Sequence, residues 1–193
     1  TSERNLGHLG GLIHRMPWVA WFGLIGTLAI AGLPPLNGFV SEWLLLQAFL
    51  FSPGLPNPYL NMLVPLGSAA LVLAAALSGY VMVKFYGVIF LGQPREGRSG
   101  EAHDAGIWER VALAWFAAGC VALGLFPMAI ILLLDHVTRP LLSFALSTAI
   151  SGNGWLLFAP VAAERASYGP LLFLLGIVGT LLVTFIAVRA FYH

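Results

Sequence analysis

Four long apolar blocks alternate with polar linkers along the chain. The blocks run from Pro17 to Phe51, from about Leu60 to Leu91, from about Ile107 to Leu134 and from about Tyr168 to Phe191. A membrane-spanning helix needs ~20 consecutive apolar residues, and the second, third and fourth blocks each meet that length once. The pattern therefore predicts an all-α polytopic membrane protein with about four membrane segments.

Composition supports this fold class and narrows the function classes. The 193 residues are 59% hydrophobic and 9% charged, whereas a soluble domain carries roughly 25% charged residues. A net charge of +1 offers no basic face to phosphates, so we expect no nucleic-acid partner. The single cysteine, Cys120, excludes an internal disulfide and a cysteine metal cluster. Nucleotide, dinucleotide and catalytic-triad motifs are absent from the sequence, so we expect no catalytic residue, metal or cofactor.

The polar linkers set the expected boundaries. Residues 1–16, TSERNLGHLGGLIHRM, resemble a loop between two membrane helices, so we expect the sequence to be the C-terminal part of a longer protein. Residues 17–135 would form the main membrane domain, 136–167 an extramembrane or interfacial linker, and 168–193 an additional C-terminal membrane helix. The linker contains LLSFALSTAI, which is too short to span a bilayer and is predicted to be an interfacial or buried helix.

The first block contains a predicted helix break. In the stretch GLPPLNGFVSEWLLL, Pro34 and Pro35 are followed by Asn37 and Gly38 inside an apolar run. Proline lacks an N–H and clashes with the carbonyl one turn earlier, so the pair should free backbone carbonyls near residues 30 and 31. In lipid, such groups are tolerated only when they are buried in protein or line a wet cavity. Asn37 and Ser41 flank the break and are candidate hydrogen-bond partners for water or for Glu42. Capping of the second half-helix would explain Asn37 equally well.

Loop charge distinguishes two topologies for this first block. It could cross twice, with a turn at the proline pair, or once as a broken helix. Cytoplasmic loops carry an excess of Lys and Arg. Arg4 and Arg15 precede the block and Arg95 and Arg98 follow the second block, whereas the intervening loop 52–58 has no basic residue. One broken crossing places both basic loops on the same side, and we predict that arrangement.

Glu42 is the most unusual residue of the first block. It lies nine residues before Phe51, which is ~14 Å along a helix and about half of a ~30 Å hydrocarbon core. An ionisable side chain at that depth faces a bundle interior or a water path and is a functional candidate by default. Burial raises the pKa of a carboxyl group and a nearby cation lowers it, so a carboxylate between these influences can load and release protons. A structural ion pair or a protonated packing residue is the alternative.

Lys84 is the second charge within an apolar block, in GYVMVKFYGVIFLG. It lies nine residues before Gln93, ~13 Å along a helix. Its ammonium group could reach the interface by snorkelling. It could instead line the same proton path as Glu42, because a short loop joins the first two blocks. Both interpretations remain open.

Three stretches together resemble a known family: LGGLIHRMP, GLPPLNGFVSEWLLLQAF and KFYGVIFLGQPR. They are similar to the antiporter-like membrane subunits shared by respiratory complex I, multisubunit cation/proton antiporters and membrane-bound hydrogenases. LPPLNGFVSEW looks most like the large membrane subunit of formate hydrogenlyase and hydrogenase-4 (subunit 3, or component B). The resemblance covers about Leu9 to Pro127 and is weak from about Thr138 onward.

The resemblance assigns roles to both charged residues. It implies that the proline motif forms the twelfth membrane helix of the family and carries a glutamate or lysine on a central axis of proton transfer. Glu42 falls on that position, and Lys84 lies in the helix that follows. The other key charges of the family would precede Thr1, so this chain would supply one half of a proton channel. Many relatives carry lysine at the Glu42 position, which leaves the ion and its direction open.

The expected function follows from this resemblance. We expect a non-catalytic, proton-translocating membrane subunit, in part, of a membrane-bound hydrogenase or complex I-like redox complex in a prokaryotic cytoplasmic (inner) membrane. Its partners would be other membrane subunits and peripheral subunits with nickel–iron and iron–sulfur centres. One alternative is a subunit of a cation/proton antiporter without redox partners. Another is a structural membrane anchor that does not pump.

Overall fold

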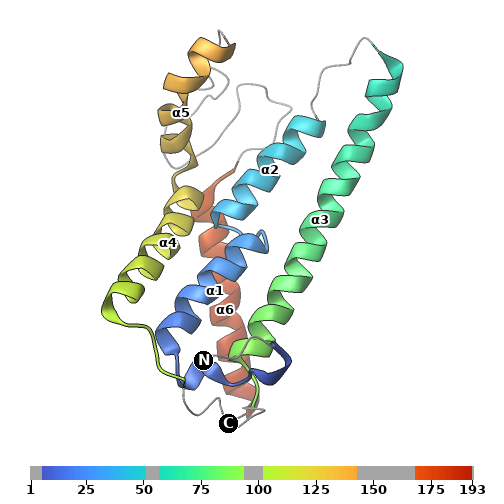
Figure 1. Ribbon diagram of the computed structural model, residues 1–193. Helices are drawn as coiled ribbons and strands as arrows, with labels where there is room; N and C mark the ends of the chain where they lie inside the picture. The colour runs from blue at the N-terminus through green and yellow to red at the C-terminus, as the bar shows by residue number, and fades with distance from the viewer. Residues whose placement is uncertain (1–5, 51–56, 94–101, 143–167, 193) are drawn as a thin grey trace. The chain divides into compact units, whose positions relative to one another are not determined.

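The computed structural model describes residues 6–50, 57–93, 102–142 and 168–192, and the regular elements in these ranges are helical (Figure 1). Two short 3-10 turns come first, η1 (Leu6–His8) and η2 (Leu12–His14). The α-helices are α1 (Pro17–Ile30), α2 (Asn37–Leu50), α3 (Pro58–Phe90), α4 (Ile107–Leu125), α5 (Pro127–Leu142) and α6 (Pro170–Tyr192). The predicted all-α fold class is confirmed, including a proline-broken first segment.

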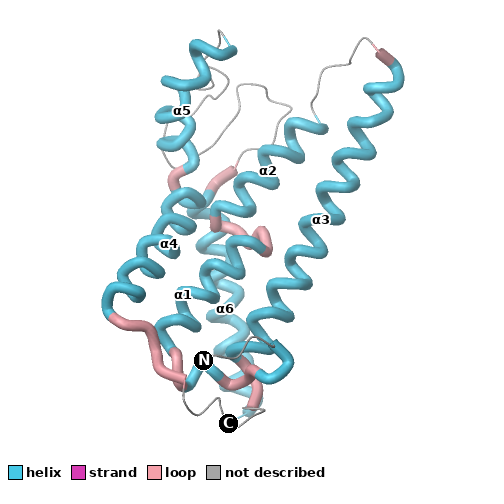
Figure 2. The backbone as a smooth tube through the Cα atoms, viewed as in Figure 1, coloured by secondary structure: helices cyan, strands magenta, loops and turns pink. Residues whose placement is uncertain are grey.

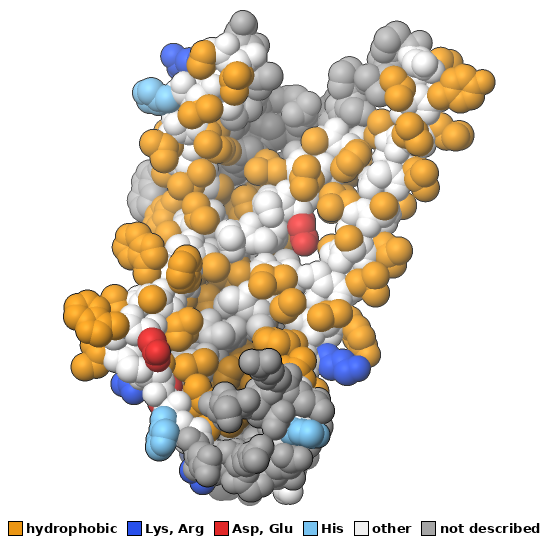
Figure 3. Space-filling model, in the orientation of Figure 1, with side chains coloured by type: hydrophobic (Ala, Val, Ile, Leu, Met, Phe, Trp, Pro, Cys, Tyr) orange, Lys and Arg blue, Asp and Glu red, His pale blue; other side chains and the backbone are white. Residues whose placement is uncertain are grey.

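Three of these helices are long and apolar enough to cross a membrane. They are α3 with 33 residues, α4 with 19 and the 22-residue stretch Pro170–Phe191 of α6. Helix α1 is apolar but has only 14 residues, ~21 Å of helix, which is shorter than the hydrocarbon core. Hydrophobic side chains predominate on the face drawn in Figure 3, as expected for helices that meet lipid or neighbouring helices.

The third apolar block contains two helices rather than one. Helix α4 ends at Leu125 and α5 begins at Pro127, with Phe126 between them. Proline cannot continue the hydrogen-bond ladder, and it disfavours helical dihedrals at the preceding residue. Helix α5 continues to Leu142 and so includes residues that the sequence assigned to the linker. The rest of LLSFALSTAI lies outside the described residues.

The chain divides into two units, residues 1–122 and 123–193. In the second unit Tyr168 is almost fully buried. Its hydroxyl donates to the Gly124 carbonyl at 3.4 Å, and its ring centroid lies 5.6 Å from that of Phe173. Burial raises the pKa of Tyr168 to about 12. These contacts hold Tyr168, two residues before α6, against the last turn of α4.

In the first unit, α1 and α2 lie one after the other along the length of α3. The Tyr86 hydroxyl donates to the Ala20 carbonyl at 3.3 Å, and a Cβ at Gly67 would lie 3.0 Å from the Phe49 ring. Positions that rise along α1 and α2 thus pair with positions that fall along α3: Ala20 with Tyr86, Ile30 with Ser78, and Phe49 with Gly67. This is the geometry of one broken run beside a long antiparallel helix, as Figure 1 shows.

A small hydrophobic core fixes one end of this arrangement. It joins the loop before α1, the start of α1 and the end of α3. The Tyr86 and Phe90 rings lie 4.9 Å apart within it, and the Gly11 N–H donates to the Leu91 carbonyl at 3.3 Å. Its buried members are Leu9, Leu12, Ala20, Tyr86, Ile89, Phe90 and Ala102. The core therefore sets the register of α1 against α3, and through it the level of the helix break.

Candidate functional site

Helix α1 ends in a closed hydrogen-bonded turn. Gly32 has a left-handed backbone with φ of 70°. Its N–H donates to the Ala29 carbonyl at 3.2 Å, and the Leu33 N–H donates to the Leu28 carbonyl at 3.1 Å. This pair of bonds around a left-handed glycine is the Schellman motif, which satisfies two of the carbonyls that a helix end leaves open.

The next two carbonyls lie where the sequence predicted freed groups, at Ile30 and Ala31. The Ile30 carbonyl accepts a hydrogen bond from the Ser78 hydroxyl of α3 at 2.9 Å. The Ala31 carbonyl lies near Gly79, where an added Cβ would be 3.9 Å from its oxygen. Within the described ranges no donor to the Ala31 carbonyl is found. One carbonyl of the break is therefore held by α3, and the next is available to another donor.

The second half-helix begins directly after the proline pair. Pro34 and Pro35 lie in the link 31–36, and α2 starts at Asn37 (Figure 2). The Asn37 Oδ1 atom is buried and has no hydrogen-bond partner in the described structure, so Asn37 does not cap α2 through its side chain. A Cβ at Gly38 would overlap the Ala29 carbonyl oxygen. Glycine is therefore what allows the two half-helices to approach so closely.

Glu42 lies one turn beyond Gly38, and its carboxylate rests against the turn that ends α1. A Cβ at Gly32 would lie 2.5 Å from Oε2 and 3.2 Å from the carboxyl carbon. Glu42 is half-buried. In the part of the chain that the structure describes, it makes no ion pair and no hydrogen bond. The Glu42 carboxylate therefore lies beside the non-helical link 31–36 and has no cation next to it in the described structure.

The other polar candidates lie away from this carboxylate. The Ser41 hydroxyl donates to the Gly38 carbonyl of its own helix at 2.8 Å. Lys84 is exposed, and its Nζ lies 5.9 Å from the Tyr80 ring centroid. At 100° per residue, Lys84 is about 160° around α3 from Tyr86, which faces α1. The structure therefore does not bring Lys84 and Glu42 together, and the transfer role of Lys84 stays a prediction.

Sequence reasoning missed Gly32, Ser78 and Gly79. Gly32 is the first residue of the proline motif, and a glycine at the end of a helix is a usual sign of a left-handed turn. Ser78 and Gly79 are small residues in an apolar helix. That signal is weak because α3 contains a similar pair, Gly67 and Ser68. Only the packing of α3 on the break distinguishes the two pairs.

Contacts among Asp104, Arg110 and Trp18 fix the start of α1. Asp104 Oδ2 accepts a hydrogen bond from the backbone N–H of Trp18 at 3.3 Å and lies 3.6 Å from Arg110 Nη2. The Arg110 guanidinium lies 5.6 Å from the Trp18 ring centroid. Since no side chain of α1 caps its own N-terminus, Asp104 supplies an acceptor from outside the helix.

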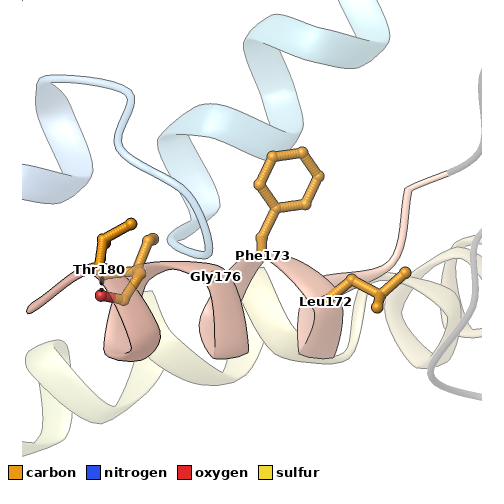
Figure 4. Close-up of a pocket in the computed structure, with 5 residues that line it drawn as sticks. Leu172, Phe173, Gly176 and Thr180 are labelled. Carbon is orange, nitrogen blue, oxygen red and sulfur yellow. Dashed lines mark hydrogen bonds between the residues drawn. The ribbon is translucent and has the colours of Figure 1, made fainter. Parts of the chain in front are cut away.

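Two cavities in the described structure are apolar. One, of about 390 Å³, lies between α1 and α3 and reaches the break. The other, also about 390 Å³, lies on α6 (Figure 4), where the Thr180 hydroxyl donates to the Ile177 carbonyl of its own helix at 2.8 Å. Neither contains a carboxylate. The first is lined by Ile13, Trp21, Leu24, Thr27, Leu28, Ala31, Met82, Val83, Tyr86 and Leu91, and the second by Leu172, Phe173, Gly176, Ile177 and Thr180.

Comparison with known proteins places the break in a family context. Residues 1–55, which include Glu42, match the family described as "NADH:quinone oxidoreductase/Mrp antiporter, TM". Hydrogenase-4 component B of Escherichia coli (strain K12) is 33% identical over 148 residues, covering 77% of this chain and 22% of that protein. Formate hydrogenlyase subunit 3 of the same strain is 36% identical over 121 residues, covering 63% and 20%. The predicted resemblance to antiporter-like membrane subunits is confirmed.

The chain is also similar in sequence to an ion antiporter subunit and in fold to a chain of a solved respiratory complex. Na(+)/H(+) antiporter subunit A1 of Staphylococcus saprophyticus is 29% identical over 128 residues, covering 66% of this chain and 16% of that protein. A chain of the membrane-bound sulfane sulfur reductase, an archaeal respiratory membrane complex, shares the fold with a TM-score of 0.73 at 23% identity. That match covers 97% of this chain and 27% of the other. This chain thus spans about a quarter, or less, of the length of the proteins it matches.

Proposed function

We propose that this chain forms part of a proton-translocating membrane subunit of a membrane-bound hydrogenase or complex I-like redox complex, with Glu42 as a proton-exchanging group. The observation that carries the proposal is the carboxylate of Glu42 against Gly32, without a cation or hydrogen-bond partner in the described structure. An intramembrane carboxylate beside unwound backbone is a recurrent arrangement at ion sites in transporters. The names of the hydrogenase and formate hydrogenlyase relatives support the class of complex.

In the proposed mechanism the backbone of the break binds water, and Glu42 exchanges a proton with that water. The Ala31 carbonyl, one residue before Gly32, can accept a hydrogen bond from water that enters the break. The Glu42 carboxylate takes a proton from hydrated protons there and becomes a neutral carboxylic acid. It later returns that proton to water or to a neighbouring group and becomes a carboxylate again. The cycle changes only the protonation state of one oxygen, so this chain needs no cofactor for it.

The partner subunits of the complex would supply the energy for transport and the rest of the proton path. Other membrane subunits would surround this chain in the cytoplasmic membrane of a prokaryote, as a multi-pass protein. Peripheral nickel–iron and iron–sulfur subunits would carry the redox reaction. Within this chain, residues 17–135 would belong to the antiporter-like domain, 136–167 to a linker and 168–193 to an additional membrane helix. Redox energy would reach Glu42 through changes in charge or position of neighbouring groups.

A second candidate is a subunit of a cation/proton antiporter without redox partners. The antiporter relative from Staphylococcus saprophyticus supports it. Nickel in the purified full-length complex would favour the hydrogenase class, whereas its absence together with sodium-dependent proton exchange would favour the antiporter. A structural anchor without pumping is the third candidate, and it predicts that Glu42 can be neutralised without loss of transport.

The test uses the full-length protein with its partners in sealed vesicles. Proton uptake is compared between the parent, Glu42→Gln and Glu42→Asp. Glutamine keeps the size and hydrogen-bonding capacity but cannot titrate, whereas aspartate keeps the carboxylate. We expect proton uptake to fall at least about tenfold in Glu42→Gln, as for loss of a general acid–base group, and to be largely retained in Glu42→Asp. Unchanged uptake in Glu42→Gln, with an intact complex on a native gel, would refute the proposal.

A further inference from the structure

Among the serine and threonine side chains that donate a hydrogen bond in the described helices, Ser78 differs from the others in its acceptor. Its Oγ–H donates to the Ile30 carbonyl, 48 positions away in the chain and on another helix. Hydroxyls in apolar helices usually turn back to a carbonyl of their own helix three or four residues earlier. That local bond is made by Thr27, Ser41, Ser68, Thr180 and Thr184. Ser78 instead donates its hydrogen bond to the helix break.

The carbonyl that Ser78 holds belongs to the last residue of α1. A helix end leaves carbonyls without intrahelical donors, and lipid provides none. The turn around Gly32 satisfies the Leu28 and Ala29 carbonyls. Ser78 satisfies that of Ile30. The position of the end of α1 on α3 therefore depends on a single side-chain donor at this level.

The glycine against which the Glu42 carboxylate lies is only two residues along the backbone from Ile30. From Ile30 the chain passes through Ala31, whose carbonyl has room beside Gly79, to the left-handed Gly32. The Glu42 carboxylate rests on Gly32. A shift of Ile30 away from α3 therefore moves the surface against which the carboxylate lies.

We propose that Ser78 is a positioning residue for Glu42: its hydrogen bond to the Ile30 carbonyl holds the end of α1 on α3, and so fixes Gly32 beneath the carboxylate. The proposal rests on the proposed function of Glu42. Ser78 does not touch the proton that is transferred. Its role is to keep the carboxylate at one place relative to the open Ala31 carbonyl.

The experiment compares three serine variants in the full-length, assembled complex. Ser78→Ala removes the donor, Ser78→Thr keeps the hydroxyl, and Ser68→Ala removes a hydroxyl of the same helix that donates to its own Pro65 carbonyl at 2.8 Å. One readout is the pH profile of proton uptake in vesicles. The other is the infrared carboxyl band of Glu42, identified by its absence in Glu42→Gln, which does not depend on transport.

We expect Ser78→Ala to reduce proton uptake about threefold to tenfold, the factor that corresponds to one lost hydrogen bond. The pH midpoint of uptake and the Glu42 band should both shift, while Ser78→Thr and Ser68→Ala resemble the parent. An unmoved Glu42 band in Ser78→Ala would overturn the proposal, as would equal effects of Ser78→Ala and Ser68→Ala. If the band moves but Glu42→Gln transports like the parent, Ser78 positions Glu42 and the proposed function of that carboxylate fails.

Discussion

Two helix breaks in the described part of the chain each have a carbonyl bound by a side-chain hydroxyl, but their surroundings differ. At the first break a hydroxyl from α3, that of Ser78, holds the Ile30 carbonyl. At the second, between α4 and α5, the Tyr168 hydroxyl holds the Gly124 carbonyl. Each break has a proline in or directly after the link between its helices. At each, a side chain distant in the sequence donates a hydrogen bond to a carbonyl in the last turn of the first helix.

The difference lies in what surrounds the freed carbonyls. The first break has a link of several residues, a left-handed glycine and a carboxylate, that of Glu42, resting on it. The second has the single residue Phe126 between its helices. The next carboxylate along α5 is Asp135, which is buried and lies 4.0 Å from Arg139. The two breaks therefore differ in whether a carboxylate without an ion pair in the described structure packs on the link, and the proposed site rests on that difference.

The largest effect is expected from closing the space between the two half-helices of the first break. Gly38→Ala places a Cβ on the Ala29 carbonyl oxygen, and such overpacking costs ~1–3 kcal/mol or more. We expect a clear fall in melting temperature and in yield of the assembled full-length protein. Gly119→Ala is the matched control, because a Cβ there meets nothing within 4 Å. Equal stability of the two variants would mean that the half-helices do not touch as described.

The next effect separates backbone strain from contact with the carboxylate. Gly32 and Gly92 both have positive φ, 70° and 84°, so alanine at either costs ~1–2 kcal/mol of strain. Only at Gly32 does the added Cβ also meet the Glu42 carboxylate. We expect both variants to lose similar stability, but only Gly32→Ala to lose proton uptake, by at least about tenfold. Uptake that falls equally in both would show that strain, and not the position of Glu42, matters.

A smaller effect is expected at the second break. Pro127→Ala restores an N–H at this position and favours a continuous α4–α5 helix. Because no unneutralised carboxylate rests on this break in the described structure, proton uptake should stay within about twofold of the parent, less than one hydrogen bond is worth. Vesicle assays at matched protein content would measure it. A loss as large as that of Glu42→Gln would make the second break part of the transfer path.

The smallest effect concerns alkaline stability. Burial raises the pKa of Tyr168 from 10.0 to about 12, so the folded protein keeps this proton at pH values where the unfolded chain releases it. The stabilisation is fully present below pH 10 and is lost as the pH rises toward about 12. We expect the melting temperature to fall between about pH 10 and about pH 12 in the parent, and to fall less in Tyr168→Phe. Parallel curves would mean that the Tyr168 hydroxyl is not buried against Gly124.

The sequence predicted the first break well because proline, glycine and a carboxylate in an apolar run are local signals. It placed the freed carbonyls near residues 30 and 31, where the structure has them. The second break was not predicted, because hydropathy runs through Pro127 without a change. Pro65 and Pro140 lie inside continuing helices, so proline alone is an uncertain signal.

The partners of the break could not be predicted from sequence. The contact between Ser78 and Ile30 joins residues 48 positions apart, and no periodicity distinguishes Ser78 from Ser68. The capping role considered for Asn37 is not seen, because its Oδ1 atom has no partner in the described structure. Lys84 faces away from the break, since a charge in an apolar helix does not by itself indicate which side it occupies. These features depend on how α3 packs against α1 and α2.

The most direct test compares the carboxylates that follow the two breaks. Proton uptake per turnover is measured in sealed vesicles that contain the full-length complex with Glu42→Gln or with Asp135→Asn. We expect turnover to continue in Glu42→Gln with proton uptake at least about tenfold below that of the parent, while Asp135→Asn keeps the uptake of the parent wherever it assembles. Retained uptake in Glu42→Gln, or equal loss in both variants, would contradict the claim that, of these two breaks, the first holds a proton-exchanging carboxylate.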